Sequence, residues 1–201
     1  NQINEYNKTL ERFDEVFRYS NLLQAIDSAD DAVLNSFARV YVYKKFVPIL
    51  NAEFTYTLDY SVDLYKTAES RPVIKSSSKF TMGDKQGCYF SDIPDTTGNG
   101  YRKIQILRGS GTEIETVVKD AGYIEGSKVV ITKFAPSSFE NGAISIEVVP
   151  NSYDVFAKQN NILSIETDTT RYSVTGTIDT IEAGSEFSGT NYTTVSKHRD
   201  A

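Results

Sequence analysis

The feature that most constrains the fold is the even spacing of turn residues from Val73 onward. Runs that alternate between apolar and polar residues are separated there by clusters of glycine and asparagine at roughly 10–15 residue intervals, a spacing typical of antiparallel strands. Glycine and asparagine tolerate the positive φ that tight turns require. We therefore expect strands near 78–82, 87–91, 101–108, 112–119, 128–134, 143–149, 161–166 and 171–179. The RGSGT run (108–112) is the best candidate for a hairpin turn.

A helix is expected at the N-terminus, before this β-rich part. Five apolar residues recur there at intervals of three and four, as on one face of an amphipathic helix: Ile3, Tyr6, Leu10, Phe13 and Phe17. A helix of two heptads is marginal on its own in water. We therefore expect it to pack on its own chain or against a helix of a partner.

A second, short helix is expected to begin at Ser20, whose hydroxyl suits an N-cap. Its apolar face is marked by Leu22, Leu23 and Ile26. Three carboxylates gather near its C-terminus, where the helix dipole disfavours negative charge: Asp27, Asp30 and Asp31.

The period then changes to two, which predicts strands at 36–47 and 53–62. The first strand has an apolar face of Val40, Val42 and Phe46 opposite Arg39, Tyr41, Tyr43 and Lys45. Pro48 should end it, because proline cannot donate to a sheet ladder. The link to the second strand is too short for a helical crossover, so we expect the two strands to pair antiparallel.

The predicted fold class is α+β, with N-terminal helices and a strand pair followed by a β-rich antiparallel sandwich or barrel-like part. We expect three parts: a helix–helix–strand–strand lead-in at 1–72, a β-rich domain at 73–181, and a polar tail or arm at 182–201. The last part is rich in glycine, serine and threonine and has no apolar period. Because the chain starts at Asn1, we expect a fragment or a processed product.

The net charge of −6 argues against a general nucleic-acid or anionic-membrane surface, because phosphate binding needs a basic patch. No apolar run approaches the roughly 20 residues of a membrane-spanning helix. The single cysteine, Cys88, excludes an internal disulfide and fits assembly in a reducing cytoplasm.

Catalysis has little support in the sequence. The one histidine, His198, lies in the polar tail, where nothing orients an imidazole beside a nucleophile. Cys88 fits a strand position and is expected to be an ordinary packed thiol. The TTGNGY run (96–101) lacks the lysine and the helix of a phosphate loop. We expect no enzyme activity, cofactor, metal or small-molecule substrate.

Two acidic groups leave alternatives open. Asp92 and Asp95 could act as paired carboxylates of a glycoside hydrolase or bind a metal, although a turn explains them more simply. Asp27, Asp30 and Asp31 could bind calcium, but they lack the ligand number and spacing of a calcium loop. Cationic side chains or backbone N–H groups are the favoured partners of this second group.

Three stretches of the chain carry a family resemblance. They are FRYSNLLQAIDSADDAVLNS (17–36) with the following ARVYVYKKF (38–46), GYIEGSKVVI (122–131), and AISIEVVPNSYDVFAKQNNILSI (143–165). Together they resemble the C-terminal region of the baseplate wedge protein of T-even-type contractile-tailed phages, a family related to the baseplate J proteins. The large N-terminal part of a wedge protein has no counterpart in this sequence.

The resemblance implies a structural protein of the virion tail baseplate that is assembled in the host cytoplasm. Wedge proteins of that family associate with copies of themselves and with other wedge proteins, in a ring that rearranges when the tail contracts. It therefore implies a homodimeric contact and no catalytic residues. The candidate interface residues are Leu10, Phe13, Phe17, Leu22, Leu23, Asp27, Asp30 and Asp31.

A different class of function competes with this interpretation. Tyrosine-rich strands and loops of asparagine, glycine and threonine could stack on and hydrogen-bond a sugar. The alternative is therefore a glycan- or surface-binding β module of a tail fibre or adhesin.

Overall fold

The computed structural model describes residues 2–12, 15–29, 36–64, 72–94, 102–156, 163, 165, 179–180 and 197–198. The chain divides into two compact units, Asn1–Ser164 and Ile165–Ala201. Within its described residues, the second unit holds one antiparallel pair, β13 (Asp179–Thr180) with β14 (Lys197–His198). The elements below belong to the first unit.

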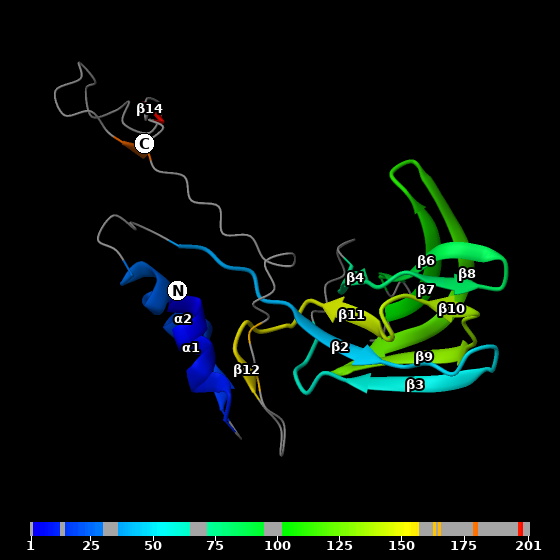
Figure 1. Cartoon of the computed structure of the whole chain (residues 1–201), viewed down its shortest axis with the longest axis horizontal. Coiled ribbons are helices and arrows are strands. Elements are labelled where there is room, and N and C mark those ends of the chain that lie inside the picture. The colour runs from blue at the N-terminus through cyan, green and yellow to red at the C-terminus, as the bar shows by residue number, and fades with distance from the viewer. Residues whose placement is uncertain are drawn as a thin grey trace. The chain divides into compact units, whose positions relative to one another are not determined.

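The main element is a curled antiparallel sheet of seven strands, which forms half a barrel (Figure 1). Its strand order is β10 (Ser138–Phe139), β5 (Phe80–Met82), β6 (Lys85–Ile93), β7 (Arg102–Ser110), β8 (Glu113–Glu125), β9 (Lys128–Phe134) and β3 (Phe54–Asp59). The run from β5 to β9 is a meander in which each strand pairs with the next along the chain.

A second sheet of three strands has the order β2 (Val42–Phe46), β11 (Ile144–Val148) and β4 (Ile74–Ser77). Alternate residues of β11 face the core, and Ile144, Ile146 and Val148 are fully buried. They belong to one apolar cluster with side chains of the seven-stranded sheet. The core therefore lies between the two sheets.

Aromatic rings fill the centre of this core. The ring centroids of Phe80 and Phe90 are 4.8 Å apart, and each lies 5.1 Å from that of Phe134. Phe46 of β2 approaches Phe134 from the other sheet, at 6.3 Å between centroids. These distances suit tilted and edge-on ring packing, which stabilises beyond the buried area alone.

The predicted α+β class is confirmed in its coarse form: the described residues contain two helices and a β-rich antiparallel part. The strands predicted near 78–82, 87–91, 101–108, 112–119, 128–134 and 143–149 correspond to β5, β6, β7, β8, β9 and β11. The RGSGT run forms the β7–β8 hairpin, in which Ser110 pairs with Glu113. The strand predicted at 161–166 and most of that at 171–179 lie outside the described residues, as does most of the 182–201 tail.

The predicted strand pair is wrong. The strands predicted at 36–47 and 53–62 are shorter in the structure, as β2 (Val42–Phe46) and β3 (Phe54–Asp59), and residues 36–41 are in no strand. They lie in different sheets, because β2 pairs with β11 and β3 pairs with β9. The short link between them passes from one sheet to the other. Each strand is thereby placed where its apolar side chains reach the shared core, for example Phe46 and Leu58.

The first helix is shorter than its apolar stripe predicts. α1 spans Gln2–Leu10, and the chain turns where the Arg12 N–H donates to the Leu10 carbonyl at 2.7 Å. Phe17 lies instead in β1 (Val16–Phe17), which pairs with β12 (Val155–Phe156). The chain folds back because the Tyr6 hydroxyl bonds both the N–H and the carbonyl of Arg18.

The second helix, α2 (Tyr19–Asp27), starts one residue earlier than predicted. Arg18 occupies the N-cap and makes no side-chain cap, so Ser20 is not the capping residue. The acceptor at this helix end is supplied by Asp154, which is more than a hundred residues away in the sequence.

Candidate interaction surfaces

Three of the predicted interface residues are buried within this chain. Leu10 is 2% exposed, Phe17 is 8% exposed and Leu22 is 9% exposed. α1 packs beside α2, and Phe17 meets the Tyr6 ring edge-on with 6.0 Å between centroids. The apolar stripe of the first helix is therefore used to join the N-terminal elements to one another.

The other predicted interface residues are placed differently. Leu23 is half-buried, and Asp27 is exposed at the end of α2. Phe13, Asp30 and Asp31 lie outside the described residues. Of the predicted set, Leu23 and Asp27 are the ones that the described structure leaves accessible to a partner.

A carboxylate from the end of the β-rich part holds the start of α2. Asp154 Oδ1 accepts the Tyr19 N–H at 2.9 Å, and Oδ2 accepts Arg18 Nη1 at 3.1 Å. The Tyr19 N–H first, and the Arg18 guanidinium after it, lower the pKa of Asp154. The Tyr19 ring also lies 5.1 Å from that of Tyr153. A negative charge is favourable at this position, because the free N–H groups at a helix start carry partial positive charge.

Asp92 is part of a buried polar network rather than of a turn. It lies in β6, is 5% exposed, and accepts the N–H groups of Val73 and Ile74 at 3.1 and 2.7 Å. Arg102 of β7, which is 4% exposed, donates Nε to the same carboxylate. The network ties the start of β4 to the seven-stranded sheet. Asp95, the other member of the predicted carboxylate pair, lies outside the described residues, as does the 96–101 run.

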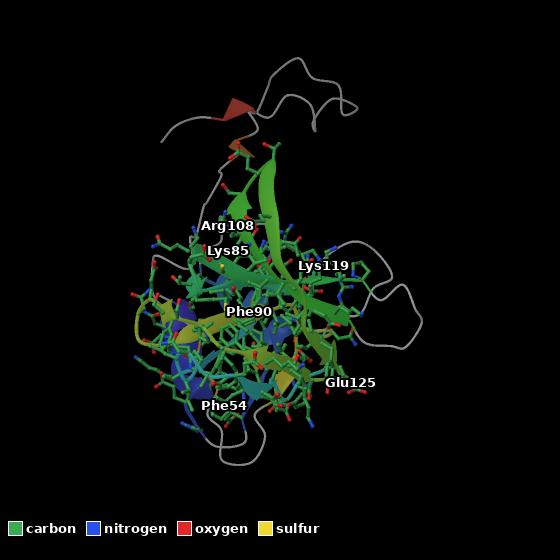
Figure 2. The ribbon with its side chains drawn as sticks, turned by 90° about the vertical axis from the view of Figure 1, so that its right-hand side faces the viewer. Phe54, Lys85, Phe90, Arg108, Lys119 and Glu125 are labelled. Atoms are coloured by element: carbon green, nitrogen blue, oxygen red, sulfur yellow. The ribbon has the colours of Figure 1, made fainter. Side chains whose placement is uncertain are left out.

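The β7–β8 hairpin extends past its neighbouring strands. β6 pairs with β7 only as far as Arg108, and β9 pairs with β8 only from Gly122 onward. Figure 2 shows Lys85 and Arg108 together at the base of the projecting hairpin. Both donate to Glu115 at 2.6 Å, and these bonds lower the pKa of that exposed carboxylate, with the Lys85 bond the larger cause.

An exposed apolar patch occupies the link between β2 and β3. We call it the 47–54 patch, and it consists of Val47, Ile49, Leu50 and Phe54, which are 65%, 54%, 44% and 46% exposed. The Ile49 N–H donates to Tyr56 Oη and the Asn51 N–H to the Pro136 carbonyl, each at 2.9 Å. Asn51 adopts a positive φ of 55°, which asparagine tolerates. These two bonds anchor the link to Tyr56 and Pro136.

The outer face of the three-stranded sheet carries rings and cations. Because Ile144, Ile146 and Val148 face the core, Ser145 and Glu147 of β11 lie on the opposite face, where Ser145 is 4% exposed and Glu147 is half-buried. Residues directly opposite in a sheet share a face, which places Lys45 and Tyr43 of β2 on the outer side. The segment just before β2 adds Phe37, Arg39 and Tyr41, and β4 adds Lys75. We call these four residues together with Tyr43 and Lys45 the ring–cation strip.

Each cation of the strip lies over a ring. Arg39 Cζ is 5.8 Å from the Phe37 centroid, Lys45 Nζ is 5.6 Å from that of Tyr43, and Lys75 Nζ is 5.8 Å from that of Tyr41. These distances are within the range of cation–π attraction. The alternation of 36–47 already placed Arg39, Tyr41, Tyr43 and Lys45 together in the sequence. Lys75 could not be added there, because it comes from another strand.

A shallow recess of about 380 Å³ lies between β5, β6 and β10. Its polar lining includes Gln86, Ser138 and Glu140, and Phe139 contributes a ring. Amide, hydroxyl and carboxylate groups beside a ring are the kind of lining that a sugar can use.

Cys88 behaves as the sequence predicts for a packed thiol. It lies in β6 and is fully buried, and burial raises the pKa of its thiol. Across the described ranges, no three histidine, cysteine, aspartate or glutamate side chains are grouped so as to hold a metal ion. No helix in that part of the chain has the length and apolar character needed to cross a membrane.

Comparison with known proteins gives no match, since no family model and no curated protein sequence is similar to this chain.

Proposed function

We propose that the chain is a structural component of a phage tail baseplate. In this role it binds copies of itself and other wedge proteins during tail assembly and contraction. The observation that carries the proposal is the resemblance of the runs 17–46, 122–131 and 143–165 to the C-terminal region of baseplate wedge proteins.

The contacts among these runs support a framework role for the residues that resemble the family. The first run contains Phe17 of β1, all of α2 and β2, and the last contains β11 and β12. β1 pairs with β12, β2 pairs with β11, and Asp154 of the last run holds the start of α2 in the first. The residues that carry the resemblance therefore hold the N-terminal elements to the three-stranded sheet.

Our proposal places the self-contact on the 47–54 patch. The buried side chains of Leu10, Phe17 and Leu22 are already used within the chain. Large exposed apolar side chains mark a site of protein–protein contact. Because hydrogen bonds already hold this link, binding costs little further ordering of the chain. The proposed occupant is the same patch of a second copy, because a two-fold contact joins identical surfaces.

Light scattering on the purified chain over a range of concentrations tests this self-contact. A dimer is expected, and Ile49→Glu should shift it toward the monomer by burying a charge in the contact. Ile114→Glu is the matched control, because Ile114 is similarly exposed, at 51%, on the β7–β8 hairpin. A strict monomer at high concentration, or equal effects of the two variants, would remove the self-contact but not the family proposal.

The family proposal itself is tested on tails. Antibodies raised against the chain should label the baseplate of contractile tails from the phage that encodes it, in immunogold electron microscopy. Labelling elsewhere on the particle, or no labelling of intact tails, would contradict the proposal.

A glycan-binding β module is the second candidate, and the recess beside Phe139 is the observation that favours it. A glycan array followed by a crystal soak would test it. The expected result is a sugar held by Gln86, Ser138 and Glu140, with binding lost in Gln86→Ala. An array without a bound glycan would remove this candidate.

A further inference from the structure

Among the described residues, no carboxylate forms an ion pair with the cations of the ring–cation strip. Elsewhere, Arg18, Arg102 and Arg108 each donate to a carboxylate. Within the described residues, Arg39 and Lys45 have ring contacts and no carboxylate within ion-pair distance, and the same holds for Lys75.

Glu147, an acid on the same face as Tyr43, is hydrogen-bonded within the sheet and keeps its charge. Glu147 lies opposite Tyr43 and Ser76, and its Oε2 accepts the Ser76 hydroxyl at 2.6 Å. The cations are exposed, so their charged groups can meet an incoming carboxylate while the rings hold their stems.

We propose that the ring–cation strip binds an extended acidic segment of a partner protein. This inference goes beyond the proposed function, because it concerns the chemistry of one surface whether or not the chain belongs to a baseplate. Charge complementarity is the argument for the occupant: the strip groups three cations on a chain whose net charge is −6. The negative net charge disfavours an acidic segment in general, whereas the three grouped cations attract it here.

The spacing of the strip favours an extended segment. Along an extended chain, alternate residues lie about 6.6 Å apart and share one face. From Arg39 to Lys45 the strip then covers roughly 20 Å, which about seven extended residues can follow. Carboxylates at alternate positions of such a segment can meet the cations in turn, while the apolar parts between them lie on the tyrosine rings.

The partner class is a protein rather than a nucleic acid. Nucleic-acid binding depends on several phosphate contacts and is weakened by a strongly acidic surface around them. Three cations on an acidic chain can make only a few phosphate contacts and so contribute little free energy to nucleic-acid binding. A short peptide, by contrast, needs only a few ion pairs backed by ring contacts.

The test measures fluorescence anisotropy of labelled peptides with the whole chain. The probes are a decapeptide of five Glu-Thr repeats, the matching Gln-Thr decapeptide, and a twelve-residue oligothymidylate. We expect the Glu-Thr peptide to bind with an affinity that falls as salt is added, because exposed charges are screened. The Gln-Thr peptide should bind at least about tenfold more weakly, since it keeps the shape but lacks the charges.

Two triple variants distinguish the effect of the strip cations on peptide binding from the effect of the net charge of the chain. Arg39→Gln/Lys45→Gln/Lys75→Gln should weaken Glu-Thr binding at least about tenfold, the order expected from losing three partly exposed ion pairs. Lys79→Gln/Lys119→Gln/Lys128→Gln changes the net charge equally at exposed positions outside the strip, and should stay within about twofold of the parent.

Each outcome decides the proposal. Thermal unfolding checks that both triple variants are folded. If the triple variant of the strip is not folded, the single variants Arg39→Gln and Lys75→Gln replace it. Loss confined to the strip variants supports the inference. No binding of the Glu-Thr peptide, equal losses in the two triple variants, or tighter binding of the oligothymidylate than of the peptide overturns it.

Discussion

The buried carboxylate of Asp92 offers a sharp test of what holds the two sheets together. Its Oδ2 accepts both the Val73 N–H and Arg102 Nε, and its Oδ1 accepts the Ile74 N–H. Asp92→Asn keeps the size of the side chain but replaces one acceptor by an NH₂ group. Whichever way the amide is turned, at least one buried donor then faces another donor.

The size of the effect follows from this geometry. Breaking a buried ion pair by removing one charge costs about 3–5 kcal/mol, and a buried donor left unsatisfied accounts for about 1–3 kcal/mol of such a loss. A domain of 150–250 residues loses roughly 2–4 °C of melting temperature for each kcal/mol. We therefore expect Asp92→Asn to lower the melting temperature by about 6–20 °C.

The matched control is Asp120→Asn. Asp120 is 72% exposed and lies 3.7 Å from Lys103 Nζ, so its ion pair should contribute less than about 1 kcal/mol. Thermal unfolding followed by circular dichroism gives both melting temperatures, and circular dichroism suits a chain that has no tryptophan for a fluorescence signal. Equal losses in the two variants would refute the role assigned to Asp92.

Three further predictions concern the Asp154 contact at the start of α2, a glycine of β8 and the Cys88 thiol. The pKa of Asp154 is lowered in the folded chain, so the stabilisation that Asp154 gives to α2 should be complete above about pH 4 and lost as the pH falls through the folded pKa. Melting temperatures measured over a pH series should therefore fall in this range in the parent, and this contribution should be missing in Asp154→Asn. In urea unfolding, Gly122→Ala should destabilise the chain far more than Gly142→Ala. Both glycines have a positive φ, but a Cβ on Gly122 would lie 2.0 Å from a backbone oxygen of β9, whereas a Cβ on Gly142 would have nothing within 4 Å. Cys88 should react with a thiol reagent only after unfolding, because it is fully buried and its pKa is raised; rapid labelling of the native chain would contradict its placement in β6.

The individual strands could be predicted from the sequence because each has one face in the core. A period of two and a glycine or asparagine at the turn are local signals, and they gave β5 to β9 and the RGSGT hairpin. Short strands without a clear period were missed, such as β4 and β12. β12 pairs over two residues, and no repeating pattern can be seen in a strand of that length.

The sheet partners could not be predicted, because pairing is decided by contacts far apart in the sequence. β2 and β3 were expected to pair because of their short link, but burial of Phe46 and Leu58 in one core places them in separate sheets. The Asp154 cap shows the same limit. A local rule pointed to Ser20, whereas the acceptor comes from the far end of the β-rich part.

The candidate surfaces could be predicted only in part from the sequence. The stripe through Leu10 and Phe17 was correctly identified as apolar, but periodicity does not distinguish a surface buried inside the chain from one offered to a partner. The alternation of rings and cations at 39–45 was present in the sequence, and the structure adds that Lys75 joins it. Asp92 looked like a turn residue because the IPD run follows it, whereas its partner Arg102 settles its role.

The central proposal is that the chain is a component of a phage tail baseplate. A cryo-electron microscopy reconstruction of contractile tails that contain the chain tests it most directly. The account predicts baseplate density that fits the curled seven-stranded sheet with its β7–β8 hairpin, and a contact between copies through the 47–54 patch. A baseplate without density for this sheet would contradict the assembly role. Density for the sheet with the patch exposed to solvent would contradict the proposed self-contact.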